Sequence, residues 1–226
     1  MSWTATNSES YPSPAALAVD VVVLTVRDGR LDVLVVRSDG GRRALPGGFV
    51  TPDEAPAGAA VRVLEQKTAL TRLYLEQLGA FAAPGRDPRG WIPSVAYLAL
   101  VPPATQPNDE QTTWVNAHGR HRWAYDHREI VHAALDRVEG KLWWSNVAVG
   151  VLPHDFSLSQ ARQVYQAIAR TTYDGATFAR DLKTTGLIQP TGQTTTDSPG
   201  RPAALYRYTT TSPTWGSGRR KRVPPG

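Results

Sequence analysis

The chain has 226 residues, of which 41% are hydrophobic, and this suits one or two domains with buried cores. It has no cysteine, which excludes disulfide bonds and thiolate metal sites, and it has no apolar run of membrane-spanning length. The net charge of +5 is uneven, because residues 1–150 are nearly balanced whereas residues 151–226 hold the excess of lysine and arginine, as is typical of a part that contacts a polyanion.

The first predicted elements are a flexible N-terminal segment and a β-hairpin. Residues 1–16 show no basic region followed by an apolar core, so they do not have the pattern of a signal peptide, and we expect a cytoplasmic protein. Two β-branched runs follow, Val19–Val26 and Leu31–Val36. The pair Asp28-Gly29 joins them and predicts a tight turn, since a type I′ turn needs positive φ at both positions.

A glycine-rich turn and a helix come next. The segment Ala44–Val50 contains Pro46-Gly47-Gly48, and residues 55–68 have the apolar spacing of a helix. We expect the helix to be capped by Asp53 and to face inward with Ala60, Val61 and Leu64. Residues 73–81 and 93–101 then predict two further strands. Strand, strand, helix, strand is the order expected of an α+β sandwich.

The loop and helix together carry a recognisable signature. Gly48, Glu54, Arg62, Leu64 and Leu70 have the spacing of the Nudix box. The stretch resembles the Nudix hydrolase superfamily, in which a loop–helix–loop holds Mg²⁺ against a substrate diphosphate. The resemblance implies a Nudix-like α/β/α sandwich over residues 17–150. The alternative for these residues alone is an ordinary loop and helix.

The other three carboxylates of that signature are missing. Three of the glutamate positions of the box hold Val63, Gln66 and Lys67, and Ala69 replaces its closing glycine. Mg²⁺ prefers oxygen ligands with negative charge, and the ammonium of Lys67 repels a dication. We therefore expect no ordinary metal-dependent hydrolysis and no required cofactor. Lys67 is instead suited to hold a diphosphate as a fixed cation.

A second cationic feature is the segment 84–91, PGRDPRGW, between the last two predicted strands. Proline and glycine stiffen it, and Arg86 and Arg89 have the planar fork that suits phosphate. It resembles the loop of ADP-ribose-type Nudix proteins and is expected to overhang the cleft, the alternative being a surface turn with an Arg–Asp pair. Further along, Asp126 predicts a helix N-cap, where His127 more plausibly packs or hydrogen-bonds than acts as a catalytic base.

The C-terminal part predicts three helices and two strands. We expect helices over residues 141–152, from 157 onward, and over 175–185, with Asp174 as a cap and Gly186 as a terminator. The aromatic pair of Trp143 and Trp144 favours packing between domains over stacking on bases. A short strand at 187–189, a polar loop at 190–200 and a returning strand complete a winged helix-turn-helix over residues 151–210, with the loop as the wing.

The order of these motifs resembles the Nudix-related transcriptional regulators of NAD metabolism. The box, PGRDPRGW, AYDH, LP-x-x-FSL, the third helix and GRPAALYRY recur in that order over roughly residues 17–210. The resemblance implies a homodimeric repressor that binds palindromic operator DNA near NAD biosynthesis or salvage genes. It also implies ADP-ribose or another NAD-derived nucleotide as the effector, and no membrane as a partner. Residues 211–226 form a basic tail that we expect to be disordered.

Two sets of site residues follow from these interpretations. The expected ligand-binding residues are Arg37, Arg43, Glu54, Arg62, Lys67, Arg86, Asp87 and Arg89. The expected DNA-binding residues are Thr177, Arg180, Lys183, Thr184, Arg201 and Arg207. Three alternatives stay open: an active ADP-ribose pyrophosphatase with an atypical box, a pseudoenzyme that scaffolds a protein complex, and a helical lid whose basic face only serves solubility.

Overall fold

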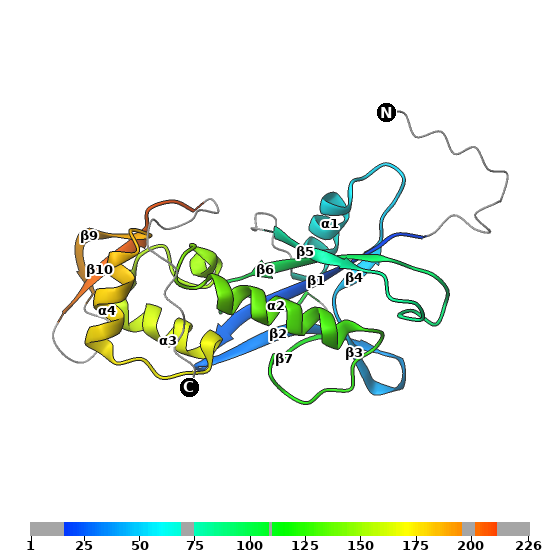
Figure 1. Cartoon of the computed structure of the whole chain (residues 1–226), viewed down its shortest axis with the longest axis horizontal. Coiled ribbons are helices and arrows are strands. Elements are labelled where there is room, and N and C mark those ends of the chain that lie inside the picture. The colour runs from blue at the N-terminus through cyan, green and yellow to red at the C-terminus, as the bar shows by residue number, and fades with distance from the viewer. Residues whose placement is uncertain (1–15, 69–74, 109, 196–201, 212–226) are drawn as a thin grey trace.

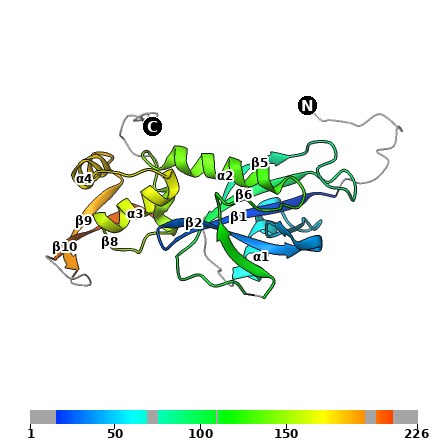
Figure 2. The same cartoon turned by 90° about the horizontal axis from the view of Figure 1, so that it is seen from below.

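The computed structural model describes residues 16–68, 75–108, 110–195 and 202–211. In Figures 1 and 2 a larger sheet with a helix on each side occupies one end, and two helices with a small sheet occupy the other. The first group contains β1 (Ala18–Arg27), β2 (Arg30–Ser38), η1 (Asp39–Gly41), β3 (Arg42–Ala44), β4 (Gly47–Phe49), α1 (Pro56–Thr68), β5 (Leu75–Phe81), β6 (Ser94–Leu100), β7 (Thr112–Asn116) and α2 (His127–Lys141). The second group contains η2 (Val147–Gly150), β8 (Phe156–Ser157), α3 (Leu158–Ala169), α4 (Gly175–Thr184), β9 (Ile188–Thr195) and β10 (Ala203–Tyr208).

The larger sheet lies between α1 and α2 (Figure 2). Its strands run in the order β3-β2-β1-β6-β5, with β4 also paired to β1 and β7 to β2, and only the β1–β6 pair is parallel among the pairings of described strands. Successive residues of a strand face opposite sides, so Val19, Val21 and Val23 pack with α1 while Val22 and Leu24 pack with α2. Both faces are covered, which explains the nearly unbroken apolar run of β1.

The predicted hairpin is confirmed. Asp28 and Gly29 have φ of 50° and 70°, and Arg27 pairs with Arg30 across the turn. Both central residues are in the left-handed region that a type I′ turn requires.

The box helix is confirmed, but two details of it were wrong. Val61 is 39% exposed, and Val63 is buried in its place. The helix begins at Pro56, a residue suited to the first helical position, so Asp53 lies too far upstream to cap it. The side that packs on the sheet consists of Ala59, Ala60, Val63 and Leu64.

The expected helix over residues 141–152 was also wrong. The helix α2 ends at Lys141, and the chain continues through turns into the short η2. Gly150 packs so closely on the end of β6 that a Cβ there would collide with the carbonyl oxygen of Leu100. The side-chain amide of Asn146 donates a hydrogen bond to the carbonyl of Thr210 at 2.8 Å. These contacts replace a regular helix with a tight link between the two halves.

The winged helix-turn-helix is confirmed. Ser157 and Gln160 form a capping box at the start of α3, and the Asp174 carboxylate accepts a hydrogen bond from the backbone N–H of Thr177 at the start of α4. The strand expected at residues 187–189 is longer than predicted, because β9 continues to Thr195 and pairs with β10. The tip of the expected wing, the N-terminal segment, the basic tail and residues 69–74 lie outside the described residues.

The two halves share one hydrophobic core. Buried residues of the β1–β2 hairpin, such as Val26 and Leu31, belong to the same cluster as Phe156 and Val164 of the winged helix. Trp143, directly after α2, makes edge-on contacts with Tyr165, Tyr173 and Phe178. The interdomain packing expected of this tryptophan is confirmed. None of the helices within the described residues is long and apolar enough to cross a membrane.

Candidate functional site

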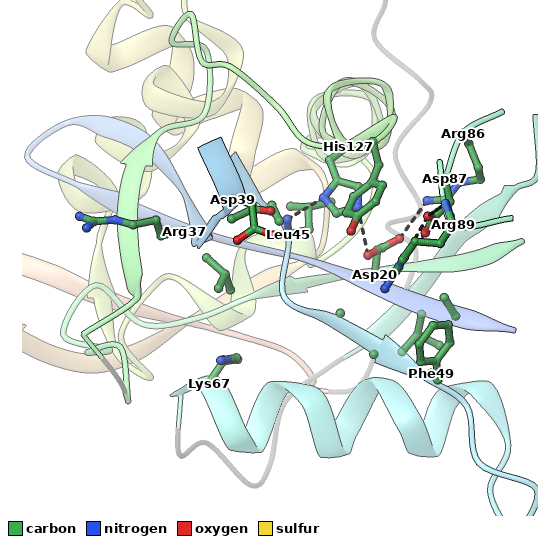
Figure 3. A pocket seen from close by; sticks show the side chains of 18 residues that line it. Asp20, Arg37, Asp39, Leu45, Phe49, Lys67, Arg86, Asp87, Arg89 and His127 are labelled. Carbon is green, nitrogen blue, oxygen red and sulfur yellow. Dashed lines mark hydrogen bonds and ion pairs between the residues drawn. The ribbon is translucent and has the colours of Figure 1, made fainter. Parts of the chain in front are cut away.

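A cleft of about 510 Å³ opens between the N-terminal end of β1, the loop after β5, the ends of α1 and β2, and the start of α2 (Figure 3). Its described lining includes the cations Arg37, Lys67 and Arg89 and the aromatic rings of Phe49 and Tyr125. Figure 3 places Lys67 at the end of α1, on the side of the hollow that faces His127 and Asp20. The lining also includes carboxylates such as Asp39 and Asp87, so the cleft combines charges of both signs with flat aromatic surface.

A buried network of charged groups forms the wall opposite α1. The Asp20 carboxylate accepts hydrogen bonds from the Ser94 hydroxyl at 2.7 Å and from Arg86 at 3.2 Å. Arg86 also donates to both carboxylate oxygens of Asp126, at 2.7 and 2.8 Å, and to the carbonyl of Ile92. Burial opposes ionisation of Asp20, but hydrogen bonds from His127 and Ser94 and the charge of Arg86 hold its pKa below the ordinary value.

The tautomer of His127 follows from its neighbours. The backbone N–H of Leu45 donates to Nδ1 at 2.8 Å, so the proton of the neutral ring is on Nε2, 3.3 Å from an Asp20 carboxylate oxygen. Both ring nitrogens are occupied, which confirms the expectation that His127 packs and hydrogen-bonds at the start of α2. Sequence reasoning missed Asp20 and Ser94, because their partners lie far away in the chain.

Arg86 does not overhang the cleft with a free guanidinium, as expected from the sequence. Its side chain is only 4% exposed, and every nitrogen of the guanidinium donates within the buried network. Asp126 has the N-cap position of α2, as predicted, but its carboxylate binds Arg86 and forms no side-chain cap. The PGRDPRGW loop is therefore tied to β1 and α2 by Arg86.

Arg89 is the exposed cation of the same loop. Asp87 accepts its side-chain hydrogen bonds at 2.7 and 3.0 Å and also that of its backbone N–H at 2.9 Å. The guanidinium carbon lies 5.4 Å from the ring centres of both Phe49 and Tyr125. The two rings are 46% and 38% exposed, and Tyr125 has φ of 52°, a conformation rare for a residue with a side chain.

Three expected ligand-binding residues do not line the cleft. Glu54 and Arg62 pair with each other at 2.5 and 3.1 Å, and Arg62 also donates to the carbonyl of Phe49, so the pair clips the box loop onto α1. The hydrogen bonds from Arg62 and from the backbone of Thr51 lower the pKa of Glu54 to about 2. Arg43 lies half-buried in β3 and joins the isolated bridge to Trp123.

The box helix does not offer the ligand set of a Mg²⁺ site. Val63 packs against the sheet and lies against Gly48, Gln66 is exposed, and Lys67 lines the cleft. These residues supply one cation and no carboxylate, so they do not fit the oxygen-rich coordination that Mg²⁺ requires.

The expected DNA-binding residues divide into three groups. Thr177, Arg180, Lys183 and Thr184 are all exposed on α4, with the Lys183 ammonium 5.3 Å from the centre of the Tyr206 ring. Arg207 differs, because it is half-buried and pairs with Asp155 at 3.0 Å, which ties β10 to the segment before β8. Arg201 lies outside the described residues.

Comparison with known proteins agrees with the two-domain organisation of the chain. Residues 14–134 match the NUDIX domain family, and residues 148–208 match the NrtR DNA-binding winged helix domain. The chain is 31% identical over 210 residues to the ADPR responsive transcriptional repressor NtrR of Acinetobacter baylyi, covering 88% of this chain and 83% of that protein.

Among the solved structures that are similar to this chain, two come from one NrtR protein. One is Shewanella oneidensis NrtR complexed with a 27mer DNA, with a TM-score of 0.74, 30% identity, and coverage of 85% of this chain and 93% of that chain. The other is the NUDIX domain of the same NrtR complexed with ADP ribose, with a TM-score of 0.50, 32% identity, and coverage of 56% and 90%. The fold and the cleft thus define a Nudix domain joined to a DNA-binding winged helix. More specifically, the chain belongs to the NrtR family.

Proposed function

We propose that this protein is a homodimeric transcriptional repressor of NAD biosynthesis or salvage genes that senses ADP-ribose or a related NAD-derived nucleotide. The observation that carries the proposal is a Nudix cleft joined to a winged helix. The described lining of the cleft includes Arg37, Lys67 and Arg89 but no glutamate, and α4 of the winged helix exposes a polar and basic face. Residues 17–150 form the effector-binding part and residues 151–210 the DNA-binding part. In the dimer, each α4 enters the major groove of one half of a palindromic operator.

The test is a mobility-shift assay with DNA from upstream of the protein's own gene, repeated with ADP-ribose, NAD and nicotinamide mononucleotide. We expect a retarded band whose intensity one of these nucleotides changes. The effect requires different nucleotide affinities in the free and DNA-bound arrangements. Failure to retard any duplex would remove the repressor role. A retarded band insensitive to all three nucleotides would keep the repressor and remove the sensor.

Charge indicates how the effector lies in the cleft. The buried network has two carboxylates, Asp20 and Asp126, around one guanidinium, Arg86. A diphosphate is therefore better placed toward Lys67, away from this wall. The exposed rings of Phe49 and Tyr125 then offer a flat surface to the adenine.

Calorimetry tests this placement. We expect Lys67→Ala and Phe49→Ala each to weaken ADP-ribose binding by on the order of ten-fold, since a charge-assisted phosphate contact or a base–aromatic stack contributes about 1–3 kcal/mol. Arg42→Ala is the matched control, because Arg42 is exposed and does not line the cleft. Unchanged binding in both variants would keep the sensor role but discard this orientation.

We also propose that the Nudix domain holds its nucleotide without cleaving it. Incubation with ADP-ribose and Mg²⁺ should release negligible AMP, because Gln66 and Lys67 stand where carboxylates are needed. The pair Gln66→Glu and Lys67→Glu should recover traces at most, because Val63 is buried against the sheet at a third such position. AMP release at the rate of an active Nudix pyrophosphatase assayed in parallel would contradict this and favour the enzyme alternative.

A further inference from the structure

A second hollow, of about 780 Å³, shares no described lining residue with the Nudix cleft. One wall is the segment between β7 and α2, which contributes His118 and Arg120. Another wall is the face of α2 that carries Arg128 and His132, and Arg170 closes the hollow from directly after α3. The NUDIX match ends at residue 134 and the winged helix match begins at 148, so both domains border this space.

The hollow has more positive than negative charge. Arg120, Arg128 and Arg170 all line it and are exposed, and none of their guanidinium groups forms an ion pair or a hydrogen bond with another described residue. Two carboxylates of α2, Asp136 and Glu139, are also in the lining and are likewise outside the ion pairs of the described chain. Three guanidinium groups against two carboxylates leave an uncompensated cation, and guanidinium groups bind phosphoryl oxygens in pairs of hydrogen bonds.

His118, a half-buried residue of the lining, has a nitrogen without a partner. Its Nε2 is buried and has no hydrogen-bond partner among the residues described, which is unusual for a buried polar atom. Burial, together with the charges of Arg170 and His132, lowers the pKa of His118, so its ring is neutral near pH 7. A neutral imidazole with its proton on Nε2 can donate to an anion.

Arg170 has an unusual backbone for its residue type. It follows the last turn of α3 with φ of 52° and ψ of 35°, the left-handed conformation in which helix ends usually place glycine. An arginine at this position is strained, and strained residues concentrate at functional sites. The strained residue is also one of the three arginines that line the hollow.

We propose that this hollow binds a small phosphate-bearing anion between the Nudix and winged-helix domains, at a site separate from the nucleotide cleft. Arg120, Arg128 and Arg170 hold the phosphoryl oxygens, and Nε2 of His118 donates to one of them once the ring turns toward the hollow. A small anion fits better than a DNA duplex, because the three arginines line a hollow and not a convex surface. The proposal does not depend on ADP-ribose binding in the cleft.

The test is calorimetric titration of the full chain with sodium pyrophosphate at constant ionic strength. We expect Arg170→Gly and Arg128→Ala each to weaken pyrophosphate binding by on the order of ten-fold or more. Arg170→Gly is informative, because glycine relieves the positive φ, so the midpoint of thermal unfolding should stay equal or rise while binding falls. Arg42→Ala serves again as the exposed control, with unchanged binding.

Three results would overturn the proposal. The first is the absence of heat with pyrophosphate at millimolar concentration. The second is loss of the heat in Lys67→Ala and its retention in Arg170→Gly, which would place the anion in the Nudix cleft. The third is unchanged pyrophosphate binding in Arg170→Gly with weaker operator binding, which would assign the hollow to the DNA interface.

Discussion

Replacing Arg86 by alanine is expected to lower the free energy of unfolding by about 3–5 kcal/mol, because it leaves two buried carboxylates without their cation. The side chains of Arg86, Asp20 and Asp126 are 4%, 9% and 10% exposed, so water cannot readily solvate the charges left behind. Urea unfolding followed by tryptophan fluorescence measures the loss.

The same loop supplies the control. Arg89 also pairs with a carboxylate, that of Asp87, but its side chain is 55% exposed. Exposed ion pairs contribute little, so Arg89→Ala should cost less than about 1 kcal/mol. An equal loss in both variants would show that the Arg86 network has no special role in stability. A much larger loss for Arg86 than for Arg89 would show that the buried network stabilises the fold.

Removing the basic side chains of α4 is expected to abolish most operator affinity. Arg180→Ala and Lys183→Ala should each cost about 1–3 kcal/mol of binding free energy, and the double variant on the order of a hundred-fold or more. The Arg180 side chain is 70% exposed and has only its helix neighbour Asp181 as a partner among described residues, at 3.3 Å. Its removal therefore disturbs little of the fold.

Fluorescence anisotropy with labelled operator at several salt concentrations measures this effect. Each lost phosphate contact should reduce the slope of log affinity against log salt by about 1, whereas a lost base contact should relax sequence preference. Arg42→Ala should bind as the wild type does. Wild-type affinity and slope in the double variant would mean that another surface reads the DNA. Arg207→Ala is a poor probe, because Arg207 is paired with Asp155.

The sequence predicted most of the architecture, because its signals there are local. The Asp28-Gly29 turn, the box helix and the cap at Asp174 each depend on neighbouring residues, and each was found as expected. The short β4 and β7 were missed, since their few residues carry no clear alternation. The segment 141–152 was misread, because an apolar run fits an α-helix and a 3-10 turn equally well. The close packing of Gly150 on the end of β6 is a long-range contact that the local sequence does not reveal.

The site was predicted less well, for a physical reason. Residue types such as arginine show that a cation is present but not which partner it will meet. Arg86 meets Asp20, 66 positions away, and Asp126, 40 positions away, and this turns an expected ligand contact into a structural one. The two aromatic residues of the cleft carried a local signal, because Phe49 directly follows Gly48 of the box and Tyr125 lies two residues before His127.

The single core that runs from the β1–β2 hairpin into the winged helix limits how a signal can travel. A hinge between the halves of one chain would have to separate Val26 and Leu31 from Phe156 and Val164 and expose their side chains to water. Within one chain, the winged helix is therefore held rigidly against the Nudix domain. In the homodimer proposed above, an effector would therefore have to rotate one whole protomer against the other, which would change the spacing of the two α4 helices relative to the helical repeat of the operator.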